Sequence, residues 1–246
     1  MRALENLDDI EDDDLAELYA YPADLDRTWV RVNFVTTLDG AASGADGRSG
    51  SINNVPDKRV FGLLRALSDV VLVGGVTART EGYRRLRTRE GWRALRATHG
   101  LAPAPVLAVV SRSLDLPESV TEHVDDGGPV LVITTTAADP HRLAQARDRL
   151  GEASVVVAGD QDVDLPAALE QLGERGLLRV LCEGGPKVFG DLVACDRVDE
   201  LCLTVSPLLV GGDAPRITRA GPLELPLRLG HVVESDGVLL TRWLRV

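Results

Sequence analysis

LRVLCEGGPKVFGDL, residues 178–192, carries the clearest structural signal in the sequence. Apolar residues run to Cys182, Glu183 follows, and a Gly-Gly pair leads into a helix-like segment that starts at Pro186. Backbone N–H groups in the first turn of a helix have no partner inside the helix, and the helix dipole adds partial positive charge there. Glycine lets a ligand approach the backbone closely. The stretch predicts either a phosphate-binding turn of an α/β fold or a tight connection between strand and helix.

The composition indicates an ordinary folded protein. The chain has 246 residues, of which 44% are hydrophobic, and a mean hydropathy of +0.01. No apolar run approaches the roughly 20 residues of a membrane span, and the N-terminus lacks the pattern of a secretory signal. The three cysteines and four histidines show no metal-ligand spacing. We therefore expect a cytoplasmic protein with reduced thiols, no metal and no membrane partner.

Charge is distributed unevenly along the chain. The formal net charge of −11 disfavours a nucleic-acid partner, which requires a basic face. Residues 5–26 are acidic, whereas residues 79–96 are rich in arginine. The arginines of this run are Arg79, Arg84, Arg85, Arg87, Arg89, Arg93 and Arg96. They predict either a solvated surface or a pocket for a phosphorylated small molecule.

Strand and helix patterns alternate from Trp29 onward, which predicts an α/β fold with a mostly parallel central sheet. The expected strands are Trp29–Val35, Val70–Gly74, Val106–Val110, Val130–Ile133, Ser154–Val157, Leu178–Cys182 and Glu200–Ser206. The expected helices are Pro56–Leu67, His141–Leu150, Leu165–Arg175 and Pro186–Ala194.

The end of the chain has a different pattern. Residues 227–234 and 238–246 flank Ser235-Asp236-Gly237, and Asp-Gly favours a hairpin, so we expect an antiparallel pair at the C-terminus. Residues 1–27 predict an acidic N-terminal arm, with at most one amphipathic turn. Residues 28–246 show no repeat or change of composition and predict a single domain.

Two further strands end in groups suited to an anion. Gly74 and Gly75 are followed by Thr77, and Ser111 is followed by Arg112. Carboxyl ends of parallel strands line the ligand crevice of α/β folds, so these turns are expected to lie near one another. Neither glycine turn is a GxGxxG or Walker A motif. Arg112 is either a surface residue or a seat for a ribose 2′-phosphate, which would favour NADPH over NADH.

Charged residues near the first strand and first helix are further candidates. Asp39 lies in a Thr-Leu-Asp-Gly turn after the first strand, before the glycine-rich loop 41–50. Arg65 lies among apolar neighbours and requires a counter-charge, either an internal carboxylate or a bound anion.

Taken together, these motifs resemble the pyrimidine reductase family of riboflavin biosynthesis, the C-terminal reductase domain of the bifunctional deaminase-reductase. The motifs are TLDG (37–40), GRSGSIN (47–53), LLRALSDVVLVGGVT (63–77), VVSRS (109–113), CEGGPKVFGDL (182–192) and VDELCLTVSPLLVGG (198–212). The resemblance covers about residues 28–246 and implies a three-layer, dihydrofolate-reductase-like fold. The zinc signature of the deaminase partner is absent from this sequence, so we expect a reductase activity alone.

The resemblance implies an NADPH-dependent reductase of a 5-amino-6-(5-phosphoribosylamino)uracil-type substrate, and a homodimer. Hydride would pass to C1′ of the sugar, reached as an open-chain imine. The implied cofactor residues are Thr36, Gly74, Gly75, Thr77, Glu81, Ser111, Arg112, Gly184, Gly185, Pro186, Lys187, Val188 and Phe189. The implied substrate residues are Ser49, Arg65, Arg87 and Glu183, with the arginines taking the 5′-phosphate. Catalytic roles fall to Glu183, as proton donor or electrostatic stabiliser, and to Asp39, which otherwise only shapes the turn.

Two departures from the family pattern keep other functions open. The family often has Trp where this chain has Ser51, and an acidic pair and Pro where it reads Glu81-Gly82-Tyr83. One alternative is a dihydrofolate reductase-like activity on a pterin, which requires a buried carboxylate on the first helix; Asp57 is the only acidic residue there. The other is a non-catalytic, NADP-binding regulatory protein.

Overall fold

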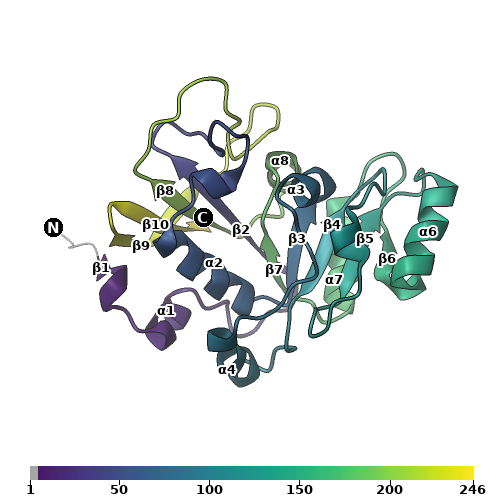
Figure 1. The fold of residues 1–246 in the computed structure, drawn as a ribbon, viewed down its shortest axis with the longest axis horizontal. Helices are drawn as coiled ribbons and strands as arrows, with labels where there is room; N and C mark the ends of the chain where they lie inside the picture. The colour runs from purple at the N-terminus through teal and green to yellow at the C-terminus, as the bar shows by residue number, and fades with distance from the viewer. Residues whose placement is uncertain (1–4) are drawn as a thin grey trace.

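The computed structural model describes residues 5–246, which form one ten-stranded sheet with helices on both faces (Figure 1). The strand order is β1-β9-β10-β8-β2-β7-β3-β4-β5-β6. The strands are β1 (Glu5–Asn6), β2 (Trp29–Thr37), β3 (Val70–Gly74), β4 (Val106–Val110), β5 (Val130–Thr134), β6 (Val155–Val157), β7 (Arg179–Cys182), β8 (Glu200–Ser206), β9 (Leu227–Ser235) and β10 (Val238–Arg245). Residues 1–4 of the predicted arm lie outside the described residues.

From β8 to β6 the neighbouring strands pair in parallel, and β10 pairs antiparallel with both β8 and β9. Every residue of β3 and of β5 is buried, as expected for parallel strands that are covered on both faces. The predicted mostly parallel sheet with an antiparallel C-terminal hairpin is confirmed.

Helices form the two outer layers. They are α1 (Asp12–Leu18), α2 (Val55–Ala66), α3 (Gly75–Thr80), α4 (Glu90–Thr98), α5 (Glu118–Thr121), α6 (Pro140–Leu150), α7 (Leu165–Glu174) and α8 (Pro186–Ala194). One apolar cluster joins the sheet to α1, α2, α4 and α6, and a second joins it to α7 and α8. Side chains at Asn54, Asp139 and Asp164 cap α2, α6 and α7, which explains why these helices begin where they do.

The sequence did not predict α3, α4 or α5. Helix α4 lies in the arginine-rich run, where a single buried stripe made of Trp92 and Arg96 replaces the usual apolar face. Arg96 is only 1% exposed, and its guanidinium donates to the carbonyls of Ala66 at 3.1 Å and Ser68 at 2.8 Å. This arginine therefore closes the C-terminal end of α2 and is not available to a ligand.

The N-terminal segment packs into the core. Leu7, Leu15 and Tyr19 are each no more than 1% exposed and belong to the apolar cluster of α2. Arginines hold the backbone of this segment: Arg59 donates to the Leu7 carbonyl at 2.8 Å, and Arg31 to the Tyr19 carbonyl at 2.7 Å. The predicted amphipathic turn is thus a helix, α1, that completes the core.

A buried ion pair joins β2 to β8. Arg31 and Glu200 face each other in the strand register, both side chains are 0% exposed, and the Tyr21 ring lies 3.9 Å from the Arg31 guanidinium. Burial opposes the charge on Arg31, but Glu200 and Tyr21 outweigh it and raise the pKa of Arg31. The sequence analysis did not predict this pair, because nothing local marks residues that far apart as neighbours.

No helix in the described part of the chain is long and apolar enough to cross a bilayer. Within residues 5–246, no three His, Cys, Asp or Glu side chains gather into a metal-binding cluster, and the three cysteines are free.

Candidate active site

The carboxyl ends of β2, β7, β3 and β4 are neighbours at one edge of the sheet. A predicted site residue lies at or directly beside the end of each of these parallel strands: Thr36, Glu183, Gly74 and Ser111, respectively. The two glycine turns touch, because the Gly74 N–H donates to the Gly184 carbonyl at 2.8 Å. The structure therefore brings together the turns that the sequence placed at strand ends.

Hydroxyl groups lie directly against the bare backbone of these turns. A Cβ on Gly75 would lie 3.2 Å from Ser111 Oγ, and a Cβ on Gly185 would overlap Thr77 Oγ1. Ser111 is buried and Thr77 is half-buried. The glycines thus leave room for two hydroxyls beside peptide groups that carry no side chain, an arrangement suited to a pyrophosphate.

Helix α8 begins at this edge without a capping side chain. Gly185 is its N-cap residue and Pro186 occupies the first turn, so no side chain competes for the free N–H groups of Lys187 and Val188. The Phe189 ring stacks on the ring of Phe34 from β2 at a centroid distance of 5.5 Å. The Lys187 ammonium pairs with Asp191 on the same helix at 2.8 Å and is exposed. The backbone of Lys187, more than its charge, therefore faces the turn.

Glu183 is a buried carboxylate, paired through both of its oxygens, at this edge of the sheet. Its carboxylate accepts two hydrogen bonds from Arg65, Nε to Oε1 and Nη2 to Oε2, both at 2.7 Å. The Glu183 side chain is 2% exposed and the Arg65 side chain 28%. The counter-charge that Arg65 requires is thus an internal carboxylate. Burial opposes the guanidinium charge, yet Glu183 raises the pKa of Arg65 above its ordinary value.

Two aromatic residues complete this pair, and neither was predicted. The Tyr83 hydroxyl donates to Glu183 Oε2 at 2.5 Å, and the Arg65 guanidinium lies 4.3 Å from the Phe61 ring. Burial, followed by the negative charge of Glu183, raises the pKa of Tyr83 well above its ordinary value. Phe61 precedes Arg65 by one helical turn, a spacing that the sequence contains. Tyr83 lies in Glu81-Gly82-Tyr83, where the sequence departs from the family pattern, and that departure could have marked the tyrosine as a site residue.

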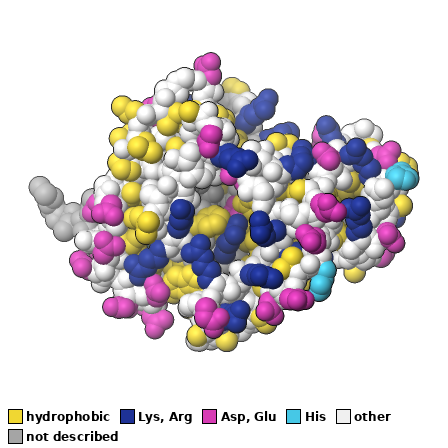
Figure 2. All heavy atoms as spheres, viewed as in Figure 1, with side chains coloured by type: hydrophobic (Ala, Val, Ile, Leu, Met, Phe, Trp, Pro, Cys, Tyr) yellow, Lys and Arg dark blue, Asp and Glu magenta, His cyan; other side chains and the backbone are white. Residues whose placement is uncertain are grey.

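The glycine-rich loop approaches the site through Ser49. Its backbone N–H donates to Glu81 Oε1 at 3.0 Å, so the loop is tied to the residue that follows α3. A predicted substrate residue and a predicted cofactor residue therefore contact each other. Arg87 is exposed, and the described contacts do not join it to this group. Figure 2 shows Lys and Arg side chains gathered over the middle of the face that carries α2 and α3.

Asp39 and Thr36 hold the turn after β2. The Asp39 carboxylate accepts from the backbone N–H groups of Val210 at 3.1 Å and Gly211 at 2.6 Å, and from the Thr37 hydroxyl. The Thr37 hydroxyl and these N–H groups lower the pKa of Asp39. Thr36 Oγ1 donates to the Ala41 carbonyl at 3.1 Å. In this structure both side chains are engaged in shaping loops.

Two more polar residues bear on the choice of ligand. Arg112 is 65% exposed at the end of β4 and pairs with Asp162, itself 83% exposed, at 2.7 Å. Such exposed pairs contribute little, so an anionic ligand can replace Asp162. Asp57, in the first turn of α2, is only 3% exposed and faces Thr204 and Asn53, and burial raises its pKa.

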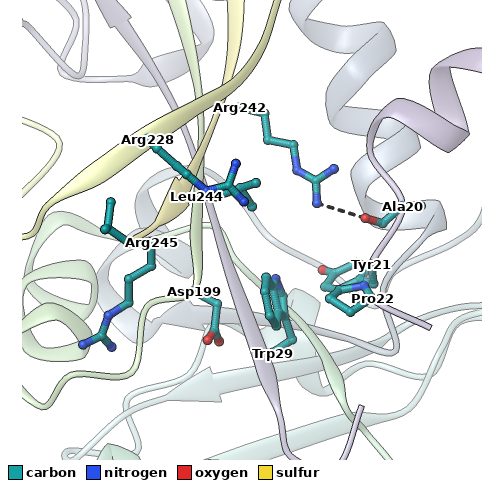
Figure 3. Close-up of a pocket in the computed structure, with 10 residues that line it drawn as sticks. Ala20, Tyr21, Pro22, Trp29, Asp199, Arg228, Arg242, Leu244 and Arg245 are labelled. Carbon is teal, nitrogen blue, oxygen red and sulfur yellow. Dashed lines mark hydrogen bonds between the residues drawn. The ribbon is translucent and has the colours of Figure 1, made fainter. Parts of the chain in front are cut away.

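A separate pocket of about 470 Å³ lies at the opposite ends of the strands, where β2 begins and β10 ends (Figure 3). Arg242 in this pocket donates to the Ala20 carbonyl at 2.9 Å and pairs with Glu200 at 2.7 Å. Arg245 pairs with Asp196. The charges of both arginines are thus satisfied within the protein. The pocket is part of the region where Arg242 holds the N-terminal segment against the sheet.

The geometry and motifs agree with the comparison to known families. The sequence profile described as the RibD C-terminal domain matches residues 28–240. The chain belongs to this family. The resemblance to pyrimidine reductases predicted from the motifs is therefore confirmed.

Two named reductases and one solved structure align with the chain over most of their own length. The chain is 32% identical over 188 residues to the 2,5-diamino-6-ribosylamino-4(3H)-pyrimidinone 5′-phosphate reductase of Methanothermobacter thermautotrophicus, covering 76% of this chain and 81% of the relative. It is 29% identical over 192 residues to the reductase of the same name from Archaeoglobus fulgidus, covering 78% and 86%. A solved pyrimidine reductase-like protein from Corynebacterium diphtheriae superimposes with a TM-score of 0.80 at 25% identity, over 94% of this chain and 98% of that one.

Proposed function

We propose that this chain is an NADPH-dependent reductase of a phosphoribosylaminopyrimidine in riboflavin biosynthesis. The observation that carries the proposal is the Glu183–Arg65 pair beside two glycine turns, in a chain related to named pyrimidinone 5′-phosphate reductases. Within this pair, Arg65 holds the negatively charged Glu183 carboxylate in place next to the proposed binding site for a cofactor pyrophosphate. That combination suits hydride transfer to a sugar-derived imine, because a nearby carboxylate stabilises the positive charge of its protonated iminium form.

A reductase of this family requires a nicotinamide cofactor, and we assign its binding site to the glycine turns. The residues that would hold it are Thr77, Ser111, the 184–185 turn and the first turn of α8, because their hydroxyls and N–H groups lie side by side. When bound, the cofactor supplies the hydride. Arg112 would receive a 2′-phosphate in place of Asp162, which supports NADPH over NADH.

On the substrate side, Glu183 acts as an acceptor and electrostatic stabiliser. Both of its oxygens already accept hydrogen bonds, from Arg65 and Tyr83, which favours this role over that of proton donor. Ser49 and Arg87 remain candidates for binding the substrate, Arg87 for its 5′-phosphate, and Asp39 for a catalytic role at the first turn. These assignments leave the imine nitrogen to take its proton from solvent.

The remaining features of the proposal concern the whole molecule. We propose a cytoplasmic homodimer with no nucleic-acid or membrane partner, consistent with the acidic composition. Residues 28–246 would form the reductase domain and residues 1–27 the arm. Sedimentation velocity on the purified chain tests the dimer.

The activity test follows the absorbance of reduced nicotinamide with purified protein. We expect NADPH oxidation with 5-amino-6-(5-phosphoribosylamino)uracil or its 2,5-diaminopyrimidinone counterpart. Turnover of dihydrofolate alone would overturn the riboflavin proposal. Tight NADPH binding with turnover of neither compound would support the regulatory alternative.

The pterin alternative is favoured by one observation. Asp57 is the buried carboxylate on the first helix of the domain that a pterin site requires, and burial raises its pKa. An Asp57→Asn variant separates the two substrates. Loss of dihydrofolate turnover, with turnover of the phosphoribosylaminopyrimidine retained, would assign Asp57 to a pterin.

A further inference from the structure

Tyr83 lies where this chain departs from the family pattern, and its backbone is fixed from two sides. Its N–H donates to the Ala78 carbonyl of α3 at 2.8 Å, and its carbonyl accepts from Ser119 Oγ of α5 at 2.7 Å. The direction of the side chain is therefore set by the helix that follows the first glycine turn.

The Tyr83 side chain closes the hydrogen-bond shell of Glu183. A carboxylate offers about four acceptor positions, two on each oxygen. Arg65 Nε takes one position on Oε1, while Arg65 Nη2 and the Tyr83 hydroxyl take both positions on Oε2. Among the described contacts, one acceptor position stays open, and it is on Oε1.

We propose that Tyr83 is a positioning residue that fixes the rotation of the Glu183 carboxylate and leaves only Oε1 to accept a hydrogen bond from the substrate. The inference deepens the proposed function, because the donor would be a hydroxyl or amino group of the phosphoribosylaminopyrimidine. Without the tyrosine hydroxyl, Oε2 accepts from water or from a misplaced substrate, and the reacting carbon is held less well.

The chain contains a matched control for removing this hydroxyl. Tyr21 also packs against an arginine that is paired with a buried glutamate, Arg31 with Glu200, and it lines the pocket at the opposite ends of the strands. Tyr21→Phe therefore removes the same atom from a similar charged setting away from the proposed site.

Steady-state kinetics test the role in turnover. We expect Tyr83→Phe to lower kcat/KM for the phosphoribosylaminopyrimidine about tenfold and to leave KM for NADPH within about twofold of wild type. Tyr21→Phe should keep both values within about twofold. In a Glu183→Gln background, Tyr83→Phe should have little further effect, because the two residues act as one unit. An equal loss in both backgrounds would show a merely structural role and overturn the proposal.

A second measurement needs no activity. The chain has three tyrosines, so protein labelled with ¹³C at tyrosine Cζ gives three signals, which Tyr83→Phe and Tyr21→Phe assign. Glu183→Gln should shift the Tyr83 signal and leave the Tyr21 signal in place. An unmoved Tyr83 signal would refute the contact, even if wild-type protein reduces the substrate. If wild type reduces neither compound while the Tyr83 signal shifts, the proposed function fails and the contact stands, but its role in turnover falls with that function.

Discussion

Arg65→Ala tests the reasoning on the site most directly. The substitution removes both 2.7 Å hydrogen bonds to Glu183 and leaves a carboxylate whose side chain is only 2% exposed. It also removes the guanidinium from the Phe61 ring. The main cost is therefore a buried negative charge without its partner, with a smaller loss of packing.

The magnitude follows from burial. Removing one partner of a fully buried pair costs about 3–5 kcal/mol, but the Arg65 side chain is 28% exposed and water can enter its place. We therefore expect a loss of about 2–3 kcal/mol. For a chain of this length, each kcal/mol lowers Tm by about 2–4 °C, which gives a decrease of about 4–12 °C.

Thermal denaturation followed by circular dichroism measures the effect. The exposed pair formed by Arg112 provides the control, because Arg112→Ala should change the stability by less than about 0.5 kcal/mol. Adding Glu183→Gln to Arg65→Ala should restore part of the lost stability, since a neutral amide tolerates burial better than a lone carboxylate. A double variant less stable than Arg65→Ala would refute the reasoning. In turnover, Arg65→Ala should raise KM for the phosphorylated substrate far more than KM for NADPH.

Three further outcomes follow from burial and charge. Leu15→Ala, at a 0% exposed site, should lower the free energy of unfolding in urea by about 2–5 kcal/mol, whereas Leu209→Ala, at 76% exposure, should change it little. Arg112→Ala should raise KM for NADPH about tenfold and leave KM for NADH unchanged; equal effects would remove Arg112 from the cofactor site. Burial raises the pKa of Asp57, so the wild type loses stability as the pH rises through that pKa. Asp57→Asn should therefore have the higher Tm at pH 7, and this advantage should vanish below about pH 4; a lower Tm at pH 7 would contradict this sign.

The local pattern of the sequence was sufficient for most of the fold. Continuous apolar runs predicted the strands from β2 onward within one or two residues, and Asp236-Gly237 predicted the hairpin, but β1 was not predicted. The pattern failed in residues 75–98, where α3 is short and α4 buries an arginine. Helical periodicity rests on apolar side chains, and a buried Arg96 that serves backbone carbonyls is invisible to it.

The sequence likewise predicted some features of the candidate site and missed others. The sequence alone determined which turns carry glycines and hydroxyls, that these turns end strands, and that Arg65 needs a counter-charge, because backbone geometry and desolvation act locally. The identity of the counter-charge depends on the tertiary structure: Glu183 lies 118 positions from Arg65, and Tyr83 donates to it from 100 positions away. These residues lie close together in space because β7 pairs with β3 in the sheet. Since that pairing is fixed by packing of the whole chain, no single segment could reveal it.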